Sequence, residues 1–147
     1  MHKLAPCLLI TCSLFSGCQA AGGPIDTHSA SGAAVGPVAA NAIAGDMASQ
    51  FAEQIDRPVR TPIKMDADGS DYASALEAAL RGWGFVVITD GRVGKNQKPI
   101  QLTYSIDSLN GEVLARLMTP SIALGRAYAT TPAGATPASP LSIMQRQ

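Results

Sequence analysis

Hydrophobic and polar positions change their spacing along the chain, and the first regular stretch has the spacing of a helix. From Pro37 on, apolar residues recur every four positions, which places them on one helical face. These residues are Ile43, Met47, Phe51 and Ile55. The helix is expected to end at Arg57–Pro58, because the residue before a proline avoids the helical region. Such an apolar face can bind a membrane surface or a partner, but it packs more often on its own domain.

The next segment alternates between apolar and polar residues. From Val59 to Met65 the apolar side chains share one face, which predicts a half-buried strand. Pro62 has no N–H to donate to a neighbouring strand, so we expect this strand at an edge of the sheet. Its unpaired side is then a candidate for docking a partner by strand addition.

A second helix and a second strand follow. A turn over Asp66–Gly69 leads to Ser70 or Asp71, whose side-chain oxygens can cap a helix that runs to Gly82. The apolar run Phe85–Thr89 then predicts a strand in the centre of the sheet.

The remaining regular segments predict an antiparallel meander. Its strands are Leu102–Ile106, Val113–Met118 and Ile122–Tyr128. Asp107–Gly111 has the composition of a hairpin turn. The order of the elements predicts an α+β domain over residues 37–130, with a small antiparallel or mixed sheet and one or two helices packed on one face.

The segments that flank this domain have no hydrophobic periodicity. Residues 18–36 are rich in Ala, Gly and Ser, which is typical of a flexible tether. Residues 131–147 are dominated by Thr, Pro, Ala and Ser, and we expect a disordered, low-complexity tail.

Residues 1–17 have the pattern of a lipoprotein signal peptide. Lys3 gives a basic start, and the apolar run 4–15 is too short to span a bilayer, which takes about 20 residues. Phe15-Ser16-Gly17-Cys18 resembles the lipobox of bacterial lipoproteins, in which the cysteine takes a diacylglyceryl group and a peptidase cuts just before it. The sequence therefore predicts lipidation at Cys18, with palmitate as an acyl chain.

The other cysteines agree with this interpretation. They lie inside the apolar run and leave with the signal, so Cys18 is the single cysteine of the mature chain and no internal disulfide can form. Asp after the cysteine often retains lipoproteins at the inner membrane; Gln19 stands there, so we expect an outer-membrane protein facing the periplasm. The alternative is an ordinary secretory signal cut near Ala20 or Ala21, which leaves a soluble periplasmic protein.

Charge and composition exclude one class of partner and limit the core. The chain of 147 residues has 11 Lys and Arg against 11 Asp and Glu, so it lacks the cationic surplus of nucleic-acid-binding proteins. Apolar residues make up 46% of the chain but aromatic residues only 5%, which predicts a small core.

Two motifs resemble sites but lack their chemistry. Gly91–Lys95 lacks the spacing of a phosphate-binding loop and is more typical of a hairpin turn. Asp66, Asp68 and Asp71 lack the spacing of a calcium loop and fit helix capping better.

Catalytic residues are equally difficult to assign. Both histidines, His2 and His28, precede the folded part, so a Ser-His or Cys-His pair has no base, and His28 alone is a poor metal ligand. Asp107 and Glu112 would be an acid/base pair by residue type alone. We expect a protein that is not an enzyme and has no cofactor, metal or small-molecule substrate.

Three short blocks between residues 72 and 128 form a pattern together. In Tyr72–Val87 a helix with an aromatic start ends in an Arg-x-x-Gly-aromatic turn into a strand, and the later blocks are Leu102–Asp107 and Leu124–Tyr128. In their order and spacing these blocks resemble the TrbH family of conjugal transfer lipoproteins. The lipobox and the Pro-bounded first helix are similar too, so the resemblance covers most of residues 1–130. After Thr130 the chain departs from the family, where a basic end with a tryptophan is expected, and the role of this segment stays open.

The resemblance implies an outer-membrane lipoprotein of a conjugative type IV secretion apparatus, active in mating-pair formation. It would be a structural, anchoring subunit that contacts channel or core-complex subunits. The alternative is a free-standing envelope lipoprotein, such as a pilotin or a surface-exclusion factor. A third hypothesis, a cell-wall hydrolase, lacks a base or metal site.

Overall fold

The computed structural model describes residues 30–31, 35–55 and 61–146. The predicted signal peptide, Cys18, His28 and most of the predicted tether lie outside these residues, as do Arg57–Arg60.

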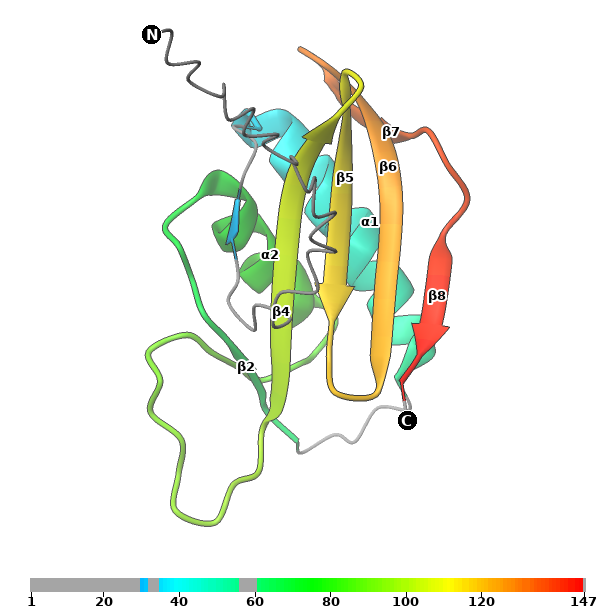
Figure 1. Cartoon of the computed structure of the whole chain (residues 1–147). Coiled ribbons are helices and arrows are strands. Elements are labelled where there is room, and N and C mark those ends of the chain that lie inside the picture. Colours follow the sequence, from blue (N-terminus) through cyan, green and yellow to red (C-terminus); the bar gives the residue numbers. More distant parts are fainter. Residues whose placement is uncertain (1–29, 32–34, 56–60, 147) are drawn as a thin grey trace, which may run out of the picture.

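A mixed sheet of eight strands forms one layer of the molecule (Figure 1). Its main path runs β3-β2-β4-β5-β6-β7, while β1 pairs with β4 and β8 pairs with β6. The bounds are β1 Ala30–Ser31, β2 Ile63–Met65, β3 Val87–Ile88, β4 Ile100–Leu109, β5 Glu112–Met118, β6 Ile122–Thr131, β7 Gly134–Pro137 and β8 Ser142–Gln145. The pairs among β1 to β4 are parallel, and the pairs from β4 to β8 are antiparallel.

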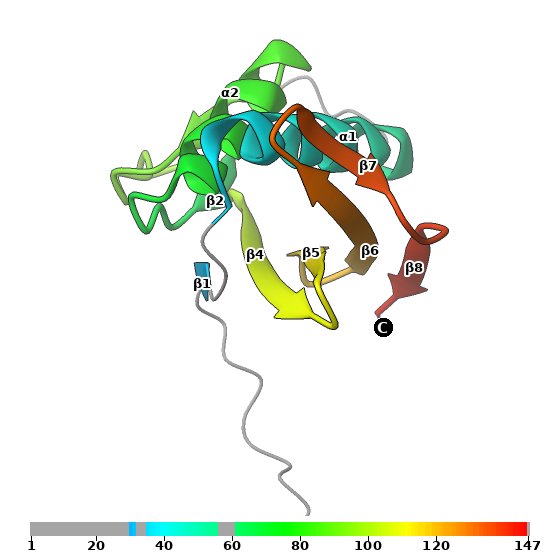
Figure 2. The same ribbon diagram turned by 90° about the horizontal axis from the view of Figure 1, so that it is seen from above.

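Two helices in the described part of the chain cover one face of this sheet (Figure 2). They are α1, Pro37–Gln54, and α2, Asp71–Gly82. The core lies between the helices and the sheet, and its largest fully buried side chains include Tyr72, Tyr104 and Tyr128. The predicted α+β class is therefore confirmed.

Helix α1 has the predicted apolar face, and this face packs on its own domain. Ile43, Met47 and Phe51 are fully buried. Pro37 stands in the first turn, where its missing N–H is not needed. The helix ends at Gln54, a little before the predicted Arg57–Pro58.

Helix α2 begins and ends as predicted. Ser70 is its N-cap, and the Ser70 hydroxyl accepts a hydrogen bond from the Ala73 amide at 3.1 Å. Asp71 lies in the first turn and Arg81 in the last, where their charges interact favourably with the helix dipole.

The meander is also confirmed, as strands β4, β5 and β6. Asn110 and Gly111 join β4 to β5 with φ of 53° and 84°, the positive values that a two-residue type I′ turn requires.

The predicted positions of two other strands in the sheet were wrong. β2, which is the described part of the Val59–Met65 strand, lies between β3 and β4 and pairs with both. Pro62 does not prevent this, because it precedes the strand and its carbonyl accepts a hydrogen bond from Ile100 N at 2.9 Å. β3, from the Phe85–Thr89 run, is an edge strand of two residues rather than a central strand.

The prediction of a disordered tail over residues 131–147 was wrong for the residues that the structure describes. β7 and β8 both pair with β6, one beyond the other along its edge. Within the predicted flexible tether, Ala30–Ser31 pairs with Ser105 and Ile106 of β4. Backbone pairing needs no hydrophobic period, so composition did not reveal these strands.

Candidate functional site

Two of the acidic residues considered for chemistry, Asp68 and Asp107, have structural partners. Asp68 Oδ1 accepts a hydrogen bond from the amide of Ser70 at 3.0 Å, which closes the turn before α2. Asp107 forms an exposed ion pair with Arg116 at 3.3 Å, and Glu112 stands opposite Leu109 at the end of the hairpin. Within the described residues, no three His, Cys, Asp or Glu side chains gather as metal ligands.

The sequence suggested a hairpin turn at Gly91–Lys95, and this prediction was wrong. The loop that contains these residues connects β3 to β4, which both run parallel to β2 on its two sides, so it is a crossover connection. Its start is a local turn in which Asp90 Oδ1 accepts a hydrogen bond from Arg92 N at 3.0 Å.

A polar cluster that the sequence analysis missed joins α1 to β6. Asp46 Oδ2 accepts hydrogen bonds from the Tyr128 hydroxyl at 2.6 Å and from Arg126 Nη1 at 2.8 Å. Burial, followed by the hydrogen bond to Asp46, raises the pKa of Tyr128. The same carboxylate raises the pKa of Arg126, which stays a cation. The sequence holds one indication of this cluster: Asp46 lies three positions after Ile43, so a charged residue stands on the apolar face of the helix.

Arg126 also holds the segment between β7 and β8. Its Nε donates a hydrogen bond to the Ser139 carbonyl at 3.1 Å, and the Ser139 hydroxyl accepts one from Ala127 N at 2.9 Å. The Ala138 amide donates to the Ala127 carbonyl at 2.8 Å. The cluster therefore connects α1, β6 and the C-terminal segment, and its role is to position that segment.

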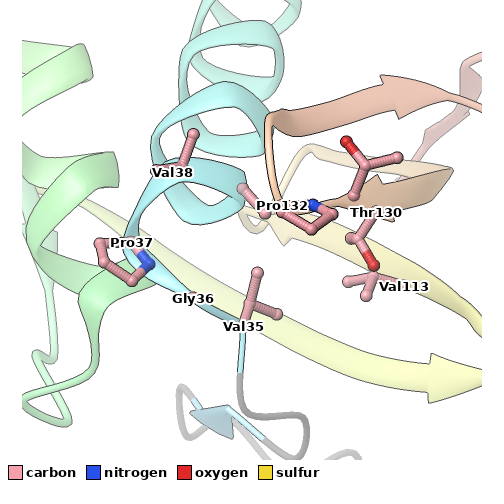
Figure 3. Close-up of a pocket in the computed structure, with 9 residues that line it drawn as sticks. Val35, Gly36, Pro37, Val38, Val113, Thr130 and Pro132 are labelled. Carbon is pink, nitrogen blue, oxygen red and sulfur yellow. The ribbon is translucent and has the colours of Figure 1, made fainter.

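An apolar groove of about 330 Å³ lies where the chain enters α1 (Figure 3). Its walls come from the residues before and in the first turn of α1, from β5 and from the turn between β6 and β7. The apolar lining residues are Val35, Pro37, Val38, Ala39, Val113 and Pro132. The lining has no charged side chain, so the groove offers contact area and no catalytic group.

Arg146 lines two further hollows, and the larger of them includes Gln54, the last residue of α1. The larger, of about 400 Å³, includes Ile55 and Gln145, and the smaller, of about 200 Å³, includes Met118. Arg146 is exposed, and its Nη1 lies 3.5 Å from the Thr119 carbonyl. These hollows adjoin β8, so this end of the molecule combines apolar surface with a cation.

The described residues contain no helix with both the length and the hydrophobicity needed to cross a membrane. The predicted lipidation site, Cys18, lies outside them.

Comparison with known proteins agrees with the resemblance in the sequence. The model of a family described as conjugal transfer protein TrbH matches residues 22–147. A probable conjugal transfer protein TrbH of Sinorhizobium fredii (strain NBRC 101917 / NGR234) is 60% identical over 140 residues, which cover 93% of this chain and 94% of that protein. No solved structure matches the chain. The chain therefore belongs to the TrbH family of conjugal transfer proteins.

Proposed function

We propose that this chain is a lipoprotein of a conjugative type IV secretion apparatus, held at the outer membrane by acyl chains on Cys18. It acts as a structural, anchoring subunit in mating-pair formation and carries out no catalysis. The part of this proposal that follows from family membership is the role in conjugal transfer.

The observation that carries the anchor is the sequence Phe15-Ser16-Gly17-Cys18 at the end of a short apolar run, in a chain of this family. Acylation of Cys18 explains why an exported chain keeps one unpaired cysteine. A single acyl chain binds a membrane only marginally, at about 0.8 kcal/mol for each buried methylene, so stable anchoring takes several chains.

The arrangement of the domain fits a tethered subunit. Cys18 precedes Ala30, which pairs with β4, by 12 positions, a reach of about 40 Å at most when fully extended. The described chain enters α1 beside the apolar groove, and β8 lies toward the other end of the helix (Figure 1). A lipid at Cys18 would therefore leave β8 accessible to other proteins of the periplasm.

The anchor is tested by metabolic labelling with radioactive palmitate and by membrane fractionation. We expect the wild-type chain to take up label and to sediment with the outer membrane, and Cys18→Ser to lose both properties. Cys12→Ser is the matched control, because it removes a cysteine from the apolar run before the lipobox and leaves the lipobox intact. Labelling of Cys18→Ser, or a soluble and unlabelled wild type, would contradict the anchor.

A further inference from the structure

We propose that the outer edge of β8 binds an extended segment of another transfer protein, which adds a strand to the sheet. The segment would present two consecutive aliphatic side chains, one on each face of the sheet, against Ile143 and Met144, and an acidic side chain against Arg146. The inference rests on the proposed function only in taking the partner to be another subunit of the transfer apparatus.

The first observation is that β8 is ordered but contributes almost nothing to the core. Leu141, just before it, packs against the core, but all four residues of Ser142–Gln145 are exposed. Ile143 is 45% and Met144 64% exposed, although both are large apolar side chains. The stability of the domain does not require these two residues to be apolar, whereas a protein contact would use them.

The second observation is that the chain fixes the position of β8 from both ends. Before the strand, Arg126 and Ala127 hold Ser139 through two hydrogen bonds. After the strand, the Arg146 amide donates to the Ser121 carbonyl at 2.8 Å. An edge that is already ordered loses less conformational entropy on binding, which favours affinity.

The third observation is a contrast between the edges formed by β3 and β8. At β3, the Arg81 guanidinium donates to the Val87 carbonyl at 3.2 Å and is paired with Glu77 at 2.6 Å, so a charged side chain covers this edge. The sequence of β8 has no proline and no charge. Among the described strands β8 pairs only with β6, and apart from its short length it lacks these protections against an incoming strand.

The hydrogen bond between Arg146 and Ser121 also fixes which backbone groups of β8 are available. In an antiparallel pair the residues alternate between facing the partner strand and facing away. The backbone N–H and C=O groups of Met144 therefore face β6, while those of Ile143 and Gln145 point outward. These groups can receive one short strand.

Charge favours a different protein over a second copy of this chain. A two-fold pairing of β8 with itself through Ile143 and Gln145 would place Met144 against Met144 and Arg146 against Ser142. Both Arg146 side chains would then stay without an anion, although each lies beside two open hollows. Arg146 has no ion pair among the described residues, so an acidic partner residue is the better complement.

The test is site-specific photo-cross-linking in mating cells, with a benzophenone side chain in place of that of Gln145, which is exposed. We expect an adduct with one transfer protein, mapped to a segment with two consecutive aliphatic residues and an acidic residue. Arg146→Glu should lower the adduct yield about tenfold, the effect of about 1.4 kcal/mol. Arg92→Glu is the matched control, because it makes the same charge reversal on a side chain that is 90% exposed in the loop before β4, and it should leave the yield unchanged.

No adduct after irradiation, or an adduct with a second copy of this chain alone, would overturn the proposal. Equal yields from Arg146→Glu and wild type would overturn it as well. Palmitate labelling of the same samples separates this inference from the proposed function. A labelled protein without an adduct contradicts the β8 interface alone, and an unlabelled protein with the expected adduct contradicts the anchor alone.

Discussion

Two buried tyrosines differ in how their hydroxyl groups are satisfied. Tyr128 donates to Asp46 at 2.6 Å. The hydroxyl of Tyr72 is buried and has no hydrogen-bond partner in the described part of the molecule. The ring of Tyr72 packs on that of Tyr104, with centroids 5.6 Å apart. The ring of Tyr72 therefore stabilises the core, while its hydroxyl group does not.

We predict that removing the two hydroxyl groups changes the free energy of unfolding differently. Tyr128→Phe should lower the free energy of unfolding by about 1–3 kcal/mol, because a hydrogen bond to a charged group is lost. Tyr72→Phe should leave this free energy unchanged or raise it, because an unsatisfied polar atom leaves the core. Equilibrium unfolding in urea measures both, and a larger loss for Tyr72→Phe would contradict the assigned contacts.

The tyrosines also predict how stability depends on pH. Burial raises the pKa of Tyr104 from 10.0 to about 12, and burial raises the pKa values of Tyr72 and Tyr128 as well. A raised pKa in the folded state means that the unfolded chain loses these protons first. The stability that the protonated tyrosines contribute is therefore fully present below pH 10 and is lost as the pH rises toward 12.

Thermal unfolding followed between about pH 8 and pH 11 measures this dependence. The melting temperature should fall steeply above pH 10, and Tyr72→Phe should reduce the slope because one titrating group is removed. A melting temperature independent of pH over this range would show that the hydroxyl groups are not buried.

At the scale of elements, the hairpin between β4 and β5 depends on its turn. Gly111 has a φ of 84°, which a residue with a side chain adopts at a cost. Gly111→Ala should therefore destabilise the protein by about 1 kcal/mol. Gly45→Ala is the matched control in α1, where nothing lies within 4 Å of an added Cβ, and it should stabilise by about 0.5–1 kcal/mol. Chemical unfolding that ranks the two in the reverse order would contradict the turn.

The C-terminal segment should depend on Arg126. We predict that Arg126→Gln increases hydrogen exchange over residues 138–146 at least about tenfold and leaves α2 protected, because local opening costs less than global unfolding. Arg116→Gln breaks an ion pair with Asp107 that is about half exposed, so it should change exchange little. Equal exchange in the two variants would show that Arg126 does not hold the segment.

Sequence patterns predicted the elements whose signals are local. The stripe on α1, the Ser70 cap and the hairpin after β4 each lie within one element or one turn, and each was confirmed. The turn itself is shorter than predicted, because Asp107–Leu109 belong to β4 and only Asn110 and Gly111 join the strands. The position of β2 in the sheet and the strands β7 and β8 depend on partners far along the chain. Long-range pairing has no local period, so these features could not be predicted.

At the scale of the whole molecule, the two candidate sites differ in how they could be found. Cys18 follows from the sequence because a lipobox is a local pattern. The edge position predicted for the Val59–Met65 strand was wrong, because β2 pairs with β3 and β4 and Pro62 precedes it. The exposed edge of β8 could not be predicted from the sequence, because its position depends on the contact between Arg126 and Ser139, which are 13 residues apart.

The central claim is that lipidation of Cys18 brings this subunit into the transfer apparatus. The most direct measurement is quantitative mass spectrometry of the proteins that co-purify with the chain from detergent-extracted membranes, for wild type, Cys18→Ser and Cys12→Ser. We predict that transfer-channel subunits accompany wild type and Cys12→Ser and are depleted at least about tenfold with Cys18→Ser. If wild type and Cys18→Ser both purify alone from the soluble fraction, the lipid anchor and the structural role are both contradicted.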